Sequence, residues 1–149
     1  MNDAKVALGR KILAIKQQQH LSWSEIAAHL GYAPSWVCAA CLGQMSMPVD
    51  AAAKTAQLLG LDEAETALLE AIPYRGSLPG AVPTDPLIYR FYELVMVYGT
   101  TWKELIQEEF GDGIMSAIDF DMALERQPDQ KGDRVKITMS GKFLPYKRY

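Results

Sequence analysis

One cation and one anion stand three residues apart in a helix-forming stretch that is otherwise uncharged. The stretch PLIYRFYELVMVYG covers residues 86–99, and Arg90 and Glu93 are its only charged residues. Its apolar residues recur at helical spacing almost all the way round, which predicts a buried helix, and side chains three apart on a helix can pair. One interpretation is a structural ion pair that fixes a subunit interface. Because a buried ion pair returns little net stability, we instead predict a functional role.

A serine in a strand-like stretch could extend this site. Ser116 shares its parity with Ile118, Phe120, Met122 and Leu124, which alternate with mostly polar residues, so its hydroxyl is expected on the apolar side of a strand. A buried hydroxyl needs a partner, and a nearby backbone carbonyl is the structural alternative. Together the three candidates would offer a guanidinium to hold an anion bidentately, a carboxylate to fix the guanidinium, and a hydroxyl donor. Such a site suits a small, planar, anionic substrate.

The cysteines and histidines offer a second possible chemistry. Cys38 and Cys41 form a C-x-x-C pair, but the only histidines, His20 and His29, lie upstream at a spacing unlike that of zinc sites. A thioredoxin-like site would need a βαβ context that the pattern lacks. We therefore predict small buried thiols, with no metal and no organic cofactor. Because both histidines fall in the helical half, Ser116 has no evident base for nucleophilic attack.

Helix signals dominate the first half of the chain. Ser22 and Glu25 form a capping box, with Gly31 as the stop signal, and Asp62 with Glu65 should start a later helix. Similar punctuation predicts about five short helices over residues 1–75. The Gly- and Pro-rich residues 76–85 are predicted to be a linker. Residues 86–149 are predicted to form a second domain with helices followed by strands. The expected class is therefore α+β, in two domains.

The helical half has the cadence of a helix-turn-helix (lambda-repressor-like) domain. Its second helix, PSWVCAACL, contains no charge and no amide, whereas a recognition helix must present such groups to base edges. We therefore predict that it contacts protein and that no nucleic acid binds. The competing hypothesis is a transcriptional regulator, with this domain in front of a small-anion sensor.

The second half is predicted to contain two helices. Asp85 should cap the first, with Pro86 at its first position and Gly99 at its end. A second capping box, TWKE at residues 101–104, should start a further helix that Gly111 terminates.

Two or three strands should follow these helices. Apolar residues alternate before and after a polar loop at 126–133, and Ser140 with Gly141 is expected to form a tight turn. A hairpin this small is marginal alone, so we predict that it packs against another copy of the chain.

Composition limits the possible settings. The chain has 149 residues, 49% hydrophobic and 22% charged, with a formal net charge of −3. This balance gives no general attraction for nucleic acid or anionic membranes, and no apolar run approaches the ~20 residues of a membrane span. The first twenty residues lack a signal peptide's apolar region. A cytoplasmic location with reduced thiols is expected.

Two segments of the second half have a distinctive sequence: residues 83–120, PTDPLIYRFYELVMVYGTTWKELIQEEFGDGIMSAIDF, and residues 141–146, GKFLPY. Both closely resemble the cyanase (cyanate hydratase, or cyanate lyase) family. The resemblance implies an enzyme that converts cyanate and bicarbonate to ammonia and carbon dioxide through carbamate. It implies Arg90, Glu93 and Ser116 as catalytic residues, with bicarbonate as co-substrate. It also implies a homodecamer of five dimers with interlaced C-terminal domains, and a helix-turn-helix-like domain that does not bind DNA. A third hypothesis makes Arg90 and Glu93 only an oligomerisation lock.

Overall fold

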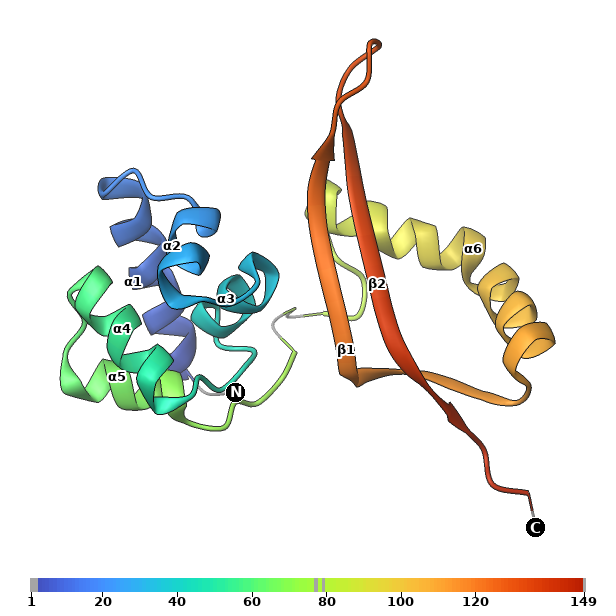
Figure 1. The fold of residues 1–149 in the computed structure, drawn as a ribbon, viewed down its shortest axis with the longest axis horizontal. Coiled ribbons are helices and arrows are strands. Elements are labelled where there is room, and N and C mark those ends of the chain that lie inside the picture. Colours follow the sequence, from blue (N-terminus) through green and yellow to red (C-terminus); the bar gives the residue numbers. More distant parts are fainter. Residues whose placement is uncertain (1–2, 77, 79, 149) are drawn as a thin grey trace. The chain divides into compact units, whose positions relative to one another are not determined.

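The computed structural model describes residues 3–76, 78 and 80–148, and the chain divides into two compact units, Met1–Ser77 and Leu78–Tyr149. Figure 1 shows helices alone in the first unit, and a long helix beside a β-hairpin in the second. The class is α+β, as predicted. Ser77 and Pro79, within the predicted linker, lie outside the described residues. No helix in the described part of the chain is both long and apolar enough to cross a membrane.

The first unit packs five helices around one core. They are α1 (Asp3–Gln18), α2 (Trp23–Leu30), α3 (Pro34–Cys41), α4 (Val49–Leu59) and α5 (Glu63–Glu70). Each helix contributes at least one side chain that is 2% exposed or less: Ile12, Ile26, Val37, Ala51 and Leu69. Burial of these apolar side chains is the main term that holds the unit together.

Local capping fixes where these helices begin and end. Ser22 accepts a hydrogen bond from the backbone of Glu25, whose carboxylate accepts one from the Ser22 backbone in return. Asp62 and Glu65 form the same reciprocal arrangement before α5. Gly31 ends α2 in the left-handed conformation, at φ 79°, where a side chain would be strained. The predicted caps of these helices are confirmed.

The second unit contains one long helix where the sequence predicted two. α6 runs through Pro86–Phe110, and Asp85 caps it by accepting hydrogen bonds from the backbone of Leu87 and Ile88. The predicted stop at Gly99 and the predicted capping box at residues 101–104 are wrong, because both lie inside the helix. A glycine in a helix interior costs about 1 kcal/mol relative to alanine, which is too little to break a 25-residue helix. Gly111 does terminate it, as predicted.

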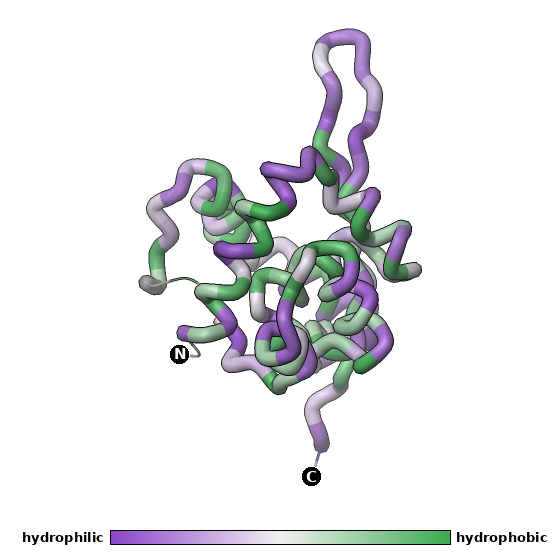
Figure 2. The backbone as a smooth tube through the Cα atoms, turned by 90° about the vertical axis from the view of Figure 1, so that its left-hand side faces the viewer, coloured by the Kyte–Doolittle hydropathy of each residue, from purple (hydrophilic) through white to green (hydrophobic). Residues whose placement is uncertain are grey.

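Strands β1 (Gly113–Gln127) and β2 (Arg134–Pro145) form a two-stranded antiparallel sheet. The turn between them falls at residues 128–133. The predicted turn at Ser140 and Gly141 is wrong, because these residues lie inside β2 and pair with Asp121 and Phe120. The expected third strand is therefore the continuation of β2. The turn end of the hairpin is mostly hydrophilic (Figure 2).

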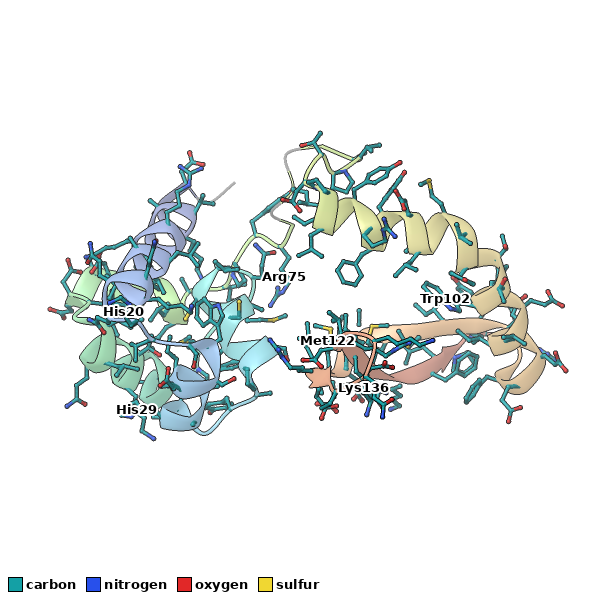
Figure 3. The ribbon with its side chains drawn as sticks, turned by 90° about the horizontal axis from the view of Figure 1, so that it is seen from above. His20, His29, Arg75, Trp102, Met122 and Lys136 are labelled. Atoms are coloured by element: carbon teal, nitrogen blue, oxygen red, sulfur yellow. The ribbon has the colours of Figure 1, made fainter. Side chains whose placement is uncertain are left out.

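The hairpin has one apolar and one polar face. Met122 pairs with Met139 on the apolar face, whereas Glu125 pairs with Lys136 on the polar one. In Figure 3, Trp102 of α6 and Met122 lie on the facing sides of helix and hairpin, and Lys136 lies on the far side. The prediction that the helix is buried fails within one chain, because α6 has no buried residue. Its apolar side chains stay substantially exposed, for example Leu87 at 71% and Val97 at 63%.

Candidate active site

The predicted ion pair forms on the first turns of α6. Arg90 Nε lies 3.4 Å from Glu93 Oε2, and their side chains are 69% and 40% exposed. Both residues stand one helical turn apart, so the helix itself sets their separation. Leu87, Phe91 and Leu94 beside them are all exposed apolar residues. The ion pair is thus surrounded by an apolar surface.

The geometry of this pair leaves its anion-binding edge available. Glu93 approaches Arg90 at Nε, and Arg90 has no second carboxylate partner among the described residues. The two terminal amino groups of a guanidinium form the planar fork that binds carboxylate-like anions with two parallel hydrogen bonds. Glu93 can therefore orient Arg90 while the fork holds a small anion.

Ser116 is buried, at 5% exposure, in a region of β1 that is otherwise exposed. Its Oγ accepts hydrogen bonds from the backbone N–H groups of Ile118 and Asp119, each at 3.0 Å. The structural alternative predicted from the sequence was a hydrogen bond from Ser116 to a backbone carbonyl, whereas the observed partners are backbone amides. A serine hydroxyl has two acceptor lone pairs and one proton. Because both acceptor positions are used, Ser116 is set to act as a hydrogen-bond donor.

A large bulge in β1 explains the position of Ser116. Between the pairs Met115–Phe143 and Phe120–Gly141, β1 has the four residues 116–119 and β2 has only Lys142. β1 therefore carries an excess of three residues. A bulge bends its strand, and Figure 1 shows β1 changing direction near its start.

The bulge overturns the parity argument made from the sequence. An odd excess of residues shifts the alternation of faces across the bulge, so Ser116 does not share a face with Phe120 or Met122 through regular strand pleating. Ile118, expected on the apolar side, is 98% exposed. The prediction that the Ser116 hydroxyl is buried holds, but for a different reason: it folds back onto the main chain of its own bulge.

The structure brings two of the three predicted site residues together. Arg90 and Glu93 pair, whereas no hydrogen bond or ion pair joins Ser116 to either of them within the described residues.

Comparisons with known proteins identify the family. Residues 5–73 match the family described as "Cyanate hydratase, N-terminal", and residues 80–148 match "Cyanate lyase C-terminal domain". The chain belongs to the cyanate hydratase (cyanase) family. It is 59% identical to the cyanate hydratase of Methylibium petroleiphilum over 98% of this chain and 99% of that protein. It is 54% identical to that of Albidiferax ferrireducens over the full length of both.

A solved structure from this family has the same fold. The crystal structure of cyanase from T. urticae superimposes with a TM-score of 0.80 at 35% identity, covering 93% of this chain and 96% of that chain. With relatives of this similarity over nearly its whole length, the chain is a cyanate hydratase enzyme.

In this cyanase-family chain the thiols are packed side chains. Cys41 is 1% exposed, and burial raises the pKa of its thiol to about 12. Burial also raises the pKa of Cys38, less strongly. His20 and His29 are exposed, and the described residues contain no group of three or more His, Cys, Asp or Glu side chains placed to hold a metal ion. These thiols are therefore poor nucleophiles and poor metal ligands.

The structure also reveals a pocket that the sequence did not predict. A cavity of about 220 Å³ lies where the end of α6 meets the apolar face of the hairpin, beside the bulge. It is lined by Ile106, Phe110, Met115, Met139, Ser140, Gly141 and Phe143. Its residues come from three elements, so only the strand register could have shown that they meet.

Proposed function

We propose that this enzyme decomposes cyanate in a bicarbonate-dependent reaction, releasing ammonia and carbon dioxide through carbamate. The observation that carries the proposal is the Arg90–Glu93 pair, the only charges on the first four turns of α6, in a chain whose relatives are cyanate hydratases. A forked cation on an apolar surface is suited to small planar anions. Bicarbonate fits that description, and cyanate is a small linear anion of the same charge.

The reaction takes up two protons in all. A bicarbonate oxygen adds to the carbon of cyanate, and the nitrogen of the adduct takes up one added proton and receives the proton of the bicarbonate hydroxyl. Loss of carbon dioxide from the adduct leaves carbamate, H2N–COO⁻. Carbamate then takes up a second proton, and cleavage of its C–N bond gives ammonia and a second carbon dioxide. No electrons are gained or lost, and no metal or organic cofactor takes part.

Bringing the two anions together is the main electrostatic difficulty. Two unit charges of the same sign 4 Å apart repel by about 4 kcal/mol at the effective dielectric of a protein surface. Arg90 offsets this repulsion and holds the reactants in contact, so it contributes by charge and by proximity.

Glu93 and Ser116 support Arg90. Glu93 orients the guanidinium through Nε and relays a proton. Ser116, with both acceptor positions bonded to backbone amides, donates its proton to a bound anion. Nucleophilic attack by Ser116 is the less favoured role, because in the described part of the chain its hydroxyl is bonded to the backbone amides of Ile118 and Asp119 and not to a base.

We further propose that the complete site forms in an assembly, a homodecamer of five dimers with interlaced C-terminal domains. Within one chain Ser116 does not bond to Arg90 or Glu93, and α6 leaves its apolar side chains exposed. An exposed apolar surface of this kind marks an interaction site. The N-terminal unit is proposed to be helix-turn-helix-like without binding DNA, and the location to be cytoplasmic.

The reaction is tested by measuring ammonia released from cyanate by pure protein in carbon-dioxide-free buffer, with and without added bicarbonate. We expect rapid release only when bicarbonate is present. Equal rates in both buffers would refute the role of bicarbonate.

Light scattering on the same sample should give ten copies of the 16.6-kDa chain, and a monomeric, active protein would refute the shared site. A gel-shift assay on genomic DNA fragments should show no complex.

A further inference from the structure

Gly141 lies directly against the bulge that carries Ser116. It pairs with Phe120, the first residue of β1 after the bulge. A β-carbon added at Gly141 would lie 2.6 Å from Met115 Cγ, and closer still to the main-chain oxygen of Ser116. Gly141 therefore leaves the space that the backbone of Ser116 occupies.

This requirement concerns space and not backbone conformation, because Gly141 does not adopt a left-handed φ. Carbon atoms in ordinary contact lie about 3.5–4.0 Å apart, so an added β-carbon would displace its neighbours by about 1 Å. The side chain of Met115 can rotate away. The oxygen of Ser116 belongs to the main chain, which the two hydrogen bonds from Ile118 and Asp119 to Ser116 Oγ hold in place.

We infer that Gly141 is a positioning residue for Ser116: the absence of a side chain at this point of β2 lets the bulge pack close and sets the direction of the Ser116 hydroxyl. The inference rests on the proposed function of Ser116 and adds a second residue to it. Gly141 acts through Ser116 and touches no substrate itself. The strand register is what places it there, since it lies 25 residues away in sequence.

The expected effect of Gly141→Ala follows from the displacement. Misplacing a catalytic group by 1 Å can cost about 100-fold in rate. We therefore expect kcat for cyanate decomposition to fall by about that factor in Gly141→Ala, and hydrogen exchange at the amides of Ile118 and Asp119 to rise. KM should change less, because the guanidinium that binds the anions lies on α6.

A double-mutant cycle separates positioning from general damage. Ser116→Ala, Gly141→Ala and the double variant are compared for kcat in the assembled enzyme. If Gly141 acts through Ser116, the double variant is no slower than the slower of the two single variants. Multiplicative losses would overturn the inference, because Gly141 would then act independently of Ser116.

Two other glycines provide matched controls. A β-carbon at Gly113 would clash as severely, at 2.5 Å from Phe143 Cζ, but its three nearest atoms belong to Phe143 and Leu144 and not to Ser116. Its effect should therefore multiply with that of Ser116→Ala. The same non-multiplicative result for Gly113→Ala would mean that any distortion of the hairpin suffices, and would overturn the inference. Among the described residues, and apart from its chain neighbours, Gly80 has no atom within 4 Å of an added β-carbon, so Gly80→Ala should behave as the wild type.

A double variant with a smaller steric clash provides the test if Gly141→Ala does not fold. Met115→Ala removes Cγ and Sδ, two of the three atoms that the new β-carbon would meet. Met115→Ala with Gly141→Ala then retains the conflict with the Ser116 backbone, which is the nearest of the three atoms. Compared with Met115→Ala, it should still lose about 100-fold in kcat, and equal rates would overturn the inference.

The failures of the two proposals are distinguishable. Wild-type activity in Ser116→Ala refutes the proposed role of Ser116, and this inference with it. An inactive Ser116→Ala beside a fully active Gly141→Ala refutes this inference alone.

Discussion

Arg90→Lys keeps the positive charge on α6 and removes the planar fork, so it tests how the charge is used. The ion pair with Glu93 is exposed and 3.4 Å long. Pairs of this kind contribute about 0.3–0.5 kcal/mol to the free energy of unfolding. For a chain of this size that corresponds to a change of only about 1–2 °C in Tm. The substitution should therefore leave folding almost unaffected.

Activity should respond much more strongly than stability. A charge-assisted hydrogen bond contributes about 1.5–3 kcal/mol, and a lysine can replace only one of the two bonds that a fork makes to an anion. Loss of one bond in the transition state corresponds to about a 10- to 150-fold fall in kcat/KM. Steady-state ammonia release at saturating bicarbonate measures this value, and thermal denaturation of the same sample measures stability.

The control is Arg10→Lys, which makes the same exchange at an exposed position of α1. It should leave both kcat/KM and Tm unchanged. If Arg90→Lys retains kcat/KM within about twofold of the wild type, well inside the factor expected for one lost bond, the bidentate role of Arg90 is wrong and a point charge is enough. A large loss of activity together with dissociation of the assembly would instead support the oligomerisation-lock hypothesis.

Three further predictions follow from the packing of single residues. Gly99→Ala should raise the free energy of unfolding by about 1 kcal/mol, because the new β-carbon would meet only Val95 Cγ1, at 3.7 Å; a lower Tm would contradict a continuous α6. Burial, assisted by the charge of Arg75, lowers the pKa of Lys5 from 10.5, so the unfolded chain binds the proton more tightly. The free energy of unfolding should then rise as pH rises from the lowered pKa towards 10.5, and urea titrations of Lys5→Met should show a flatter rise. Because burial raises the pKa of Cys41 to about 12, iodoacetamide at neutral pH should label it in urea but not in the folded protein, as measured by mass spectrometry.

The sequence determined the features that depend on neighbouring residues. Ser22, Asp62 and Asp85 cap their helices as predicted, because a cap is a hydrogen bond between groups only two or three residues apart. Arg90 and Glu93 pair for the same reason: helical geometry alone brings side chains three residues apart into reach. The family resemblance, too, was visible in contiguous segments.

The tertiary structure decided whatever depends on partners distant in the chain. Gly99 continues α6 instead of ending it, because the hydrogen bonds and packing of a long helix outweigh the small penalty of one glycine. The polar loop predicted at residues 126–133 does contain the turn. Strand alternation is preserved under many registers, however, so the sequence could not show that β2 continues through Ser140 or that Gly141 faces the Ser116 bulge. The buried hydroxyl of Ser116 owes its direction to that register. Pairing between segments far apart in sequence, and not the types of the residues themselves, sets this part of the site.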